Sequence, residues 1–292
     1  MPIEQKEFVV EGDGGGVAVA DLLAQRSGLS KGRIKDAMMK GAAWLEPTRG
    51  ARRRLRRATA TLRRGERAVM YYDPDVLACV VPQGQCLVDY DDYSIWYKPP
   101  GMLSQGTEYG DHAALLRQVE KAMAPKRDAF LVHRLDSDAA GLMLFAHRRA
   151  AAARFGTLLQ QRRMRKVYAV EVCGDLRRLG AQGVFDASLD DRHATTRFVT
   201  GPYDPQQDRC GAWVAIDTGR YHQIRRHFAA AGFPVVGDRR YGCVAQGGLR
   251  LVALELTFTC PTSGASRELR LARLAPDRLA DWPWLREGVS PA

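Results

Sequence analysis

One aspartate lies where a predicted strand ends and a polar turn begins. In LVHRLDSDAAGLMLFA (131–146) an apolar run leads to His133-Arg134-Leu135-Asp136, and a second apolar run follows the turn. A carboxylate at such a strand end can face a cleft that holds little water. A single aspartate in this place usually forms a turn or caps a helix. Asp136 therefore indicates catalysis only in combination with other residues.

A helix rich in arginine supplies a second group. The segment TGRYHQIRRHFAAAGFPVVGDRRYG (218–242) predicts a helix over 222–231 whose core side carries Ile224 and Phe228. Arg225 and Arg226 then point away from that core. There a guanidinium can meet a carboxylate or a phosphate.

A tyrosine supplies the third group. The segment RRMRKVYAVEV (162–172) predicts a strand on which Tyr168 lies on the face opposite to Val167 and Ala169. From the pattern alone, a place in the core explains Tyr168 as well as a place in a site does.

The elements around these groups alternate between strands and helices. The patterns predict strands over 93–98, 130–135, 141–146, 166–172, 195–199, 213–217 and 249–258, and helices over 113–123, 150–161 and 222–231. This alternation is typical of a mixed α/β or α+β domain. We expect three parts: a small basic domain at 1–73, a polar linker at 74–86 and a large domain at 87–292.

Positive charge is confined to the small domain. The whole chain carries a formal charge of +11, and residues 26–67 alone hold fourteen cations against three acidic residues, which is also +11. The remaining residues are neutral overall. Such a concentration predicts a module that binds a polyanion, with a solvated arginine-rich face as the alternative.

Two short helices precede the arginine-rich stretch. Apolar spacing predicts one helix that ends at Gly28, and Ser30 is placed to cap a second that runs to Gly41. Lys31 and Lys35 are i,i+4 neighbours on this second helix and project from one face. With strand-like pieces at 42–45 and 68–72, residues 15–73 resemble the small RNA-binding domain first recognised in a ribosomal protein.

Length and composition exclude several classes of protein. The chain has 292 residues, 46% of them hydrophobic and 26% charged, which is typical of a folded globular protein. No apolar run approaches the ~18 residues that cross a bilayer, and the polar start MPIEQKEFVVEGDGGG differs from a signal peptide. Six cysteines without a C-x-x-C pair predict single thiols and no zinc site. We therefore expect a cytoplasmic protein without a membrane anchor or a metal.

Several motifs together resemble the RluA-type pseudouridine synthases, which act on uridines in ribosomal or transfer RNA. The motifs are HRLD-x-x-x-x-GL at 133–142, KVYAVEV at 166–172 and GR-x-HQIR-x-H-x-x-x-x-G-x-P-x-x-GD-x-x-YG at 219–242. KPPGM at 98–102 and HATT at 193–196 add to the resemblance, which covers residues 87–262 in the family's order. The family implies an α+β fold in which helices flank a mixed, largely antiparallel sheet. It also implies an isomerase that needs no cofactor and no metal.

The resemblance also implies roles for individual residues. Asp136 falls on the catalytic aspartate, which acts as a nucleophile or stabilises a cationic sugar. Arg225 falls on an arginine that pairs with it in bidentate fashion and favours its ionised form. Tyr168 falls on a tyrosine that stacks on the target uracil and assists proton removal. Ile224 falls on the apolar residue against the base, and Arg134 on an arginine associated with base extrusion.

The RNA target stays open at this point. Lys31, Lys35 and Arg53 of the basic domain are candidate RNA contacts, and this domain favours large-subunit rRNA over tRNA. Departures from the family pattern at 137, 139–140, 252 and 260 leave the target in doubt but remove no catalytic group. The alternatives are a non-catalytic RNA chaperone or ribosome-assembly factor of the same fold, and a hydrolase that uses Asp136 with a histidine. The sequence does not determine the oligomeric state, although a monomer is favoured.

Overall fold

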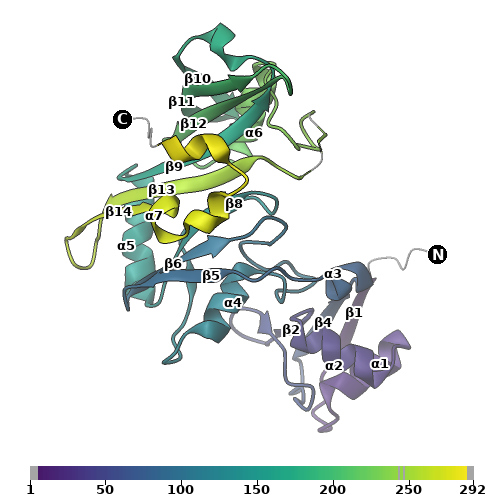
Figure 1. Ribbon diagram of the computed structural model, residues 1–292. Coiled ribbons are helices and arrows are strands. Elements are labelled where there is room, and N and C mark those ends of the chain that lie inside the picture. Colours follow the sequence, from purple (N-terminus) through teal and green to yellow (C-terminus); the bar gives the residue numbers. More distant parts are fainter. Residues whose placement is uncertain (1–5, 243, 246, 288–292) are drawn as a thin grey trace. The chain divides into compact units, whose positions relative to one another are not determined.

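The computed structural model describes residues 6–242, 244–245 and 247–287 (Figure 1). The chain forms two compact units. The first comprises Met1–Pro82 and Gln105–Gln118, and the second comprises Gln83–Ser104 and Val119–Ala292.

The first unit is a small antiparallel sheet with two helices. Its strands are ordered β1-β4-β2-β3, with bounds β1 Lys6–Glu11, β2 Ala43–Glu46, β3 Arg53–Arg54 and β4 Arg67–Tyr72. Helix α1 (Val19–Ser27) ends at Gly28, whose φ of 72° is left-handed. The Oγ of Ser30 accepts a hydrogen bond from the N–H of Arg33 at the start of α2 (Lys31–Met39). Both helix ends therefore agree with the sequence pattern.

The expected linker is partly folded. Within 74–86, helix α3 (Pro74–Ala78) follows Asp73, whose Oδ1 accepts hydrogen bonds from the N–H groups of Asp75 and Val76. Strand β5 (Gln85–Asp89) then begins the second unit. The polar composition predicts a linker, but an aspartate followed by proline is also a helix start.

A segment expected in the large domain belongs to the basic unit instead. Residues 105–118 carry Glu108 and Asp111, which meet the arginine-rich stretch: Arg52 pairs with Glu108 at 2.7 Å, and Arg56 pairs with Asp111. Arg54 lies over the ring of Trp44 at 3.8 Å. The sequence could not reveal this, because the partners are more than fifty positions apart.

The second unit is built on one long mixed sheet. Its main strand order is β10-β11-β12-β9-β13-β8-β6-β5, with β14 on β13 and β7 on β8. All of these pairs are antiparallel except β8 with β13. The strands are β6 Tyr93–Lys98, β7 Phe130–Leu131, β8 Ala140–Ala146, β9 Met164–Cys173, β10 Gln182–Leu189, β11 Arg192–Asp204, β12 Arg209–Ile216, β13 Leu251–Thr259 and β14 Ser266–Arg270. The expected α+β class with a largely antiparallel sheet is confirmed.

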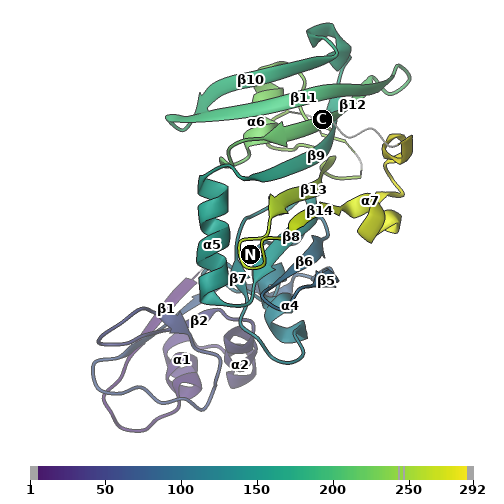
Figure 2. The same cartoon turned by 90° about the vertical axis from the view of Figure 1, so that its left-hand side faces the viewer.

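Helices flank this sheet, as Figure 2 shows for α5 (Arg149–Gln160) and α6 (Gln223–Ala230). α6 packs on β10 and β11, and α5 packs on β7 and β8. The other helices are α4 Leu115–Ala122, α7 Leu271–Leu274 and the 3-10 turns at Leu176–Leu179, Pro276–Leu279 and Pro283–Glu287. The core includes Tyr93, Phe155 and Phe258, whose rings meet edge to face.

The helices and the cysteines bear on two expectations from the sequence, the absence of a membrane span and the presence of single thiols. None of the described helices is long and apolar enough to cross a membrane. Cys79, Cys86, Cys210 and Cys260 are free thiols. Cys173 is disulfide-bonded, so the expectation that every cysteine is a single thiol is wrong for that residue.

Candidate active site

Asp136 lies in the loop between β7 and β8. The strand predicted over 130–135 ends at Leu131, because hydrogen bonds from side chains replace the sheet there. On one side of Asp136, the Oγ of Ser104 donates to Leu135 O at 2.7 Å and accepts from Leu135 N. On the other side, the buried Lys98 Nζ donates to Ser137 O at 2.8 Å. The backbone is thus held on both sides of the carboxylate.

A glycine lets this loop approach the central strand. Gly141 has a φ of +116°, and a Cβ at this position would lie only 2.3 Å from the carbonyl oxygen of Ala253. Here β8 runs parallel to β13, with Gly141 opposite Ala253. A side chain cannot be accommodated against backbone at that distance. The glycine of the HRLD-x-x-x-x-GL motif therefore allows β8 to pack closely on β13.

Arg225 is buried and joins two carboxylates. Its Nε and Nη2 donate to Asp238 Oδ2 and Oδ1 at 2.6 and 2.8 Å, and its Nη1 donates to Asp136 Oδ2 at 3.3 Å. Burial works to lower the pKa of Arg225, but the hydrogen bonds and charge of Asp238 and the charge of Asp136 outweigh it and raise the pKa. Arg225 is therefore a permanent cation beside Asp136.

This geometry corrects two expectations. The bidentate partner of Arg225 is Asp238, and Asp136 receives a single hydrogen bond. Arg225 is also 5% exposed and does not leave the core, whereas Arg226 reaches Asp190 at the surface. Asp238 could not be identified from the sequence as the partner of Arg225, since its motif GDRRY is also typical of an ordinary turn.

His222 lines the same cavity and contacts the arginine. Because a guanidinium only donates, His222 Nε2 must accept from Arg225 Nη1 at 3.2 Å, and Nδ1 then donates to the hydroxyl of Tyr241, also at 3.2 Å. Nε2 is 3.8 Å from Asp136 Oδ1. Burial first, and then the charge of Arg225, lowers the pKa of His222, although Asp136 opposes this. The sequence suggested only a structural histidine here.

Strand register brings Tyr168 to the face covered by α6. Tyr168 pairs with Val214, and Val214 pairs with Phe198, so the three side chains share one face of the sheet. Phe228 of α6 packs against Phe198 at a centroid distance of 5.8 Å. Burial, followed by the charge of Asp136, raises the pKa of Tyr168, so its phenol keeps its proton.

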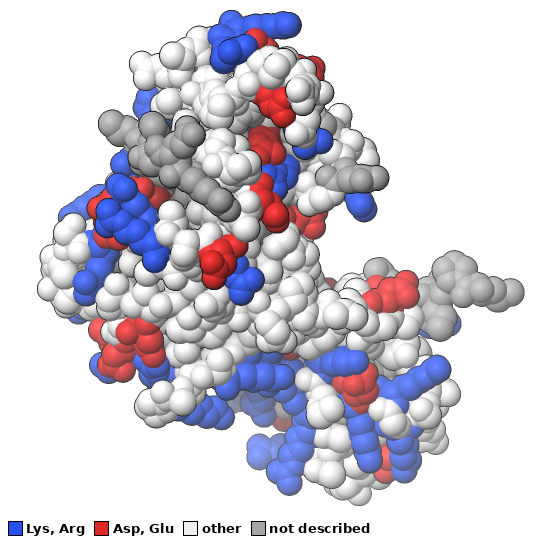
Figure 3. All heavy atoms as spheres, viewed as in Figure 1, with Lys and Arg blue, Asp and Glu red and all other residues white. Residues whose placement is uncertain are grey.

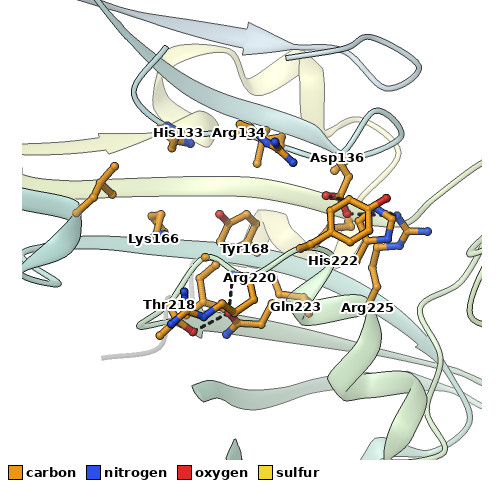
Figure 4. Close-up of a pocket in the computed structure, with 18 of the residues that line it drawn as sticks. His133, Arg134, Asp136, Lys166, Tyr168, Thr218, Arg220, His222, Gln223 and Arg225 are labelled. Atoms are coloured by element: carbon orange, nitrogen blue, oxygen red, sulfur yellow. Dashed lines mark hydrogen bonds and ion pairs between the residues drawn. The ribbon is translucent and has the colours of Figure 1, made fainter. Parts of the chain in front are cut away.

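These groups surround one cavity of about 580 Å³ (Figure 4). It is lined by all five predicted residues of the catalytic domain, together with His222 and Lys166: Arg134, Asp136, Tyr168, Ile224 and Arg225. Ile224 is buried and Arg134 is exposed. The cavity therefore combines a carboxylate, a fixed cation, an aromatic face and apolar walls, a set suited to holding a planar base next to an anionic oxygen.

The start of α6 is held in place by Gln223. Its buried amide donates to Thr195 O and Thr196 Oγ1, and its Oε1 accepts from Thr218 Oγ1 at 2.7 Å and from Arg220 N. These bonds tie α6 to β11 and to the loop after β12.

Among the described residues, no group of three or more His, Cys, Asp or Glu side chains is placed to hold a metal ion.

Comparison with known proteins decides the family. The RNA pseudouridylate synthase family matches residues 92–230, which include Asp136, Tyr168 and Arg225. A large-subunit ribosomal pseudouridine synthase D of Xanthomonas campestris is 30% identical over 73% of this chain and 67% of its own length. The chain belongs to the RNA pseudouridine synthase family. As an RluA-type member it is an intramolecular isomerase that acts on RNA.

Further relatives agree with this assignment. An uncharacterised RNA pseudouridine synthase of Aquifex aeolicus is 27% identical over 72% of this chain and 77% of its own length, while another relative is matched over half of its length. The solved human RNA pseudouridylate synthase domain containing 1 has a TM-score of 0.54 at 21% identity, over 73% of this chain and 99% of that one. This similarity supports the fold.

The synthase carries its other predicted contacts in the basic unit, where Lys and Arg crowd the face shown in Figure 3. Lys35 on α2 and Arg53 on β3 are exposed, and neither forms an ion pair with any residue that the structure describes. Lys31 instead pairs with Asp21 at 2.8 Å. At least six of the fourteen cations of residues 26–67 are paired within this unit, so its free charge is smaller than the sequence indicates.

Proposed function

We propose that this synthase modifies uridines of large-subunit ribosomal RNA, with Asp136 acting on the target nucleotide. The observation that carries this proposal is the carboxylate of Asp136 at the wall of a cavity, 3.3 Å from the buried guanidinium of Arg225. A guanidinium at that distance forms a charge-assisted hydrogen bond that orients the carboxylate. Catalysis requires this carboxylate against the target nucleotide.

The reaction exchanges one glycosidic bond for another. The bond between N1 of uracil and C1′ of ribose breaks, the base turns, and C5 bonds to C1′; C5 then loses a proton and N1 gains one. Asp136 either attacks as a nucleophile or stabilises the cationic sugar while the base is detached. Both routes need the carboxylate against the nucleotide, and neither consumes a cofactor, a metal or an energy source.

Tyr168 is better suited to stacking than to proton removal. Because its pKa is raised by burial and by Asp136, a phenolate base is disfavoured at neutral pH. Its aromatic face can bind the uracil ring, with Ile224 as an apolar neighbour. Arg134 at the exposed rim can offset part of the few kcal/mol that base extrusion costs.

Two observations favour ribosomal RNA over transfer RNA. A relative that is 30% identical is named for the large ribosomal subunit. The basic unit has exposed cations such as Lys35 and Arg53 for phosphate contacts, and its helices and strands resemble an RNA-binding domain of a ribosomal protein. Such a substrate implies a cytoplasmic enzyme, and we expect it to act as a monomer.

The test measures tritium released from uracil C5 of labelled large-subunit rRNA, prepared from a strain that lacks the gene. We expect release by the wild type and a rate at least about 10⁴-fold lower for Asp136→Asn. Asp138→Asn, a matched change at an exposed carboxylate of the same loop, should leave the rate unchanged. Activity of Asp136→Asn would remove the assigned role, and release from tRNA alone would overturn the choice of RNA.

A further inference from the structure

A buried cation without a partner lies in the cavity away from Asp136. Lys166 on β9 is only 9% exposed, and its Nζ forms no hydrogen bond or ion pair with any described residue. In Figure 4, Tyr168 lies between Lys166 and the Asp136–Arg225 pair. Buried charges in proteins are normally paired, because an unpaired one is costly. Lys166 is therefore suited to a partner that arrives from outside the chain.

Neighbouring groups do not neutralise this charge. Burial lowers the pKa of Lys166, and Asp217 opposes the shift, but Asp217 Oδ2 is already paired with Arg197 Nε at 3.4 Å. His133 lies at the same end of the cavity and accepts the N–H of Leu144 at Nε2. Burial, followed by the charge of Lys166, lowers the pKa of His133 to about 3. His133 is thus neutral and contributes no charge of its own.

We propose that Lys166 binds a phosphodiester of the RNA substrate directly next to the target uridine. This rests on the proposed function and adds a second contact point to the same cavity. An ammonium group without a partner attracts an anion, and RNA carries one on each nucleotide, whereas the carbonyl groups of uracil are neutral. Lys166 and Tyr168 are two residues apart on one strand face, about 7 Å, so the phosphate belongs to the target nucleotide or to its direct neighbour.

A glycine lies next to Lys166. A Cβ on Gly219 would be in ordinary van der Waals contact with Lys166 Nζ, at 3.7 Å, so Gly219 places no side chain of its own beside the ammonium group. The cavity that Lys166 lines also has apolar side chains in its wall, among them Leu159, Ile216 and Leu251. In such surroundings a single ammonium–phosphate contact is stronger than at an exposed site.

Stability distinguishes substrate binding from a structural role. Met has nearly the length of Lys without its charge. If the cation is held for RNA, Lys166→Met removes an uncompensated charge and raises the melting temperature of the free protein. If Lys166 instead supports the fold, the same change lowers it.

Binding is measured with the full-length chain carrying Asp136→Asn, so that the RNA is not converted. The probe is a nine-nucleotide RNA with one central uridine. We expect Lys166→Met to weaken binding about tenfold or more and to reduce the slope of log affinity against log salt by about 0.7. Lys121→Met, the same change at an exposed site on α4 outside the cavity, should alter neither quantity.

A phosphate scan makes the assignment specific. Each linkage of the probe is replaced in turn by a neutral methylphosphonate. Replacing one linkage next to the uridine should lower the affinity of the protein with Lys166 about tenfold. The same replacement should cause no further loss of affinity in Lys166→Met, as in a double-mutant cycle. Equal losses in both proteins at every linkage would overturn the proposal. Tritium release by the wild-type chain is measured separately, so failure of the isomerase function is distinguishable from failure of this subsite.

Discussion

Asp238 holds Arg225 through the two nitrogens that do not contact Asp136. Nε and Nη2 donate to a carboxylate whose side chain is 0% exposed, and Nη1 is left for Asp136 at 3.3 Å. Two parallel hydrogen bonds fix the plane of a guanidinium. Asp238 therefore orients the arginine, and the arginine in turn holds the carboxylate that faces the cavity.

Asp238→Asn should damage both stability and turnover. The change leaves Arg225 buried with a neutral partner, and breaking a buried ion pair costs about 3–5 kcal/mol in the free energy of unfolding. Urea unfolding measures this loss. Because Arg225 is then less well oriented, kcat should fall about 10²-fold, measured by tritium release.

The adjacent arginine provides the control for that experiment. Arg226 pairs with Asp190, whose side chain is 68% exposed, so Asp190→Asn should cost less than about 1 kcal/mol and leave kcat unchanged. Equal effects of the two changes would show that burial of the Arg225–Asp238 pair has no special importance.

Protonation of His222 should make kcat/KM fall at acidic pH; this fall is the acid limb of the pH profile. Its folded pKa lies below the ordinary value of 6.5, so it is neutral above that pH and takes up a proton only below it. Protonated Nε2 cannot accept from Arg225 Nη1, and kcat/KM should fall as the pH drops below 6.5. In His222→Gln the amide oxygen can still accept this bond but does not titrate, so the fall should disappear.

The corresponding comparison is His193→Gln, at a histidine whose side chain is 56% exposed. This variant should keep the acid limb of the wild type. If the limb survives in His222→Gln instead, another group causes it.

Arg53 and Arg56 should separate RNA binding from stability within the basic unit. Arg53 is exposed, so Arg53→Ala should weaken rRNA binding and reduce the salt slope by about 0.7–0.9 without changing stability. Arg56 is paired with Asp111, so Arg56→Ala should cost about 1 kcal/mol in the free energy of unfolding and leave the salt slope unchanged. The opposite pattern would mean that RNA displaces Asp111 from the arginine cluster.

Local signals in the sequence predicted many elements well. Apolar alternation predicts β6 at Tyr93–Lys98, Gly28 ends α1 and Ser30 caps α2. These signals act between residues one to four positions apart, so the chain itself contains them. β10 was missed because its outward positions are mostly exposed and its pattern is weak.

The residues of the cavity were chosen from motifs, whereas their partners were not. Asp136, Tyr168 and Arg225 line one cavity. The bidentate link of Arg225 to Asp238, the contact of His222 and the unpaired state of Lys166 had no local signal. Each depends on which side chain from another element reaches the same point.

The amino-acid sequence by itself determined the longer helices, most strands, the α+β class and the side chains available for chemistry, because hydrogen-bonding caps and side-chain periodicity operate over a few residues. Only the tertiary structure decided which carboxylate pairs with Arg225 in bidentate fashion. It also decided that residues 105–118 belong to the basic unit. Charges pair with whatever the packed chain brings within hydrogen-bond distance, and Arg225 and Asp136 are 89 positions apart in the chain.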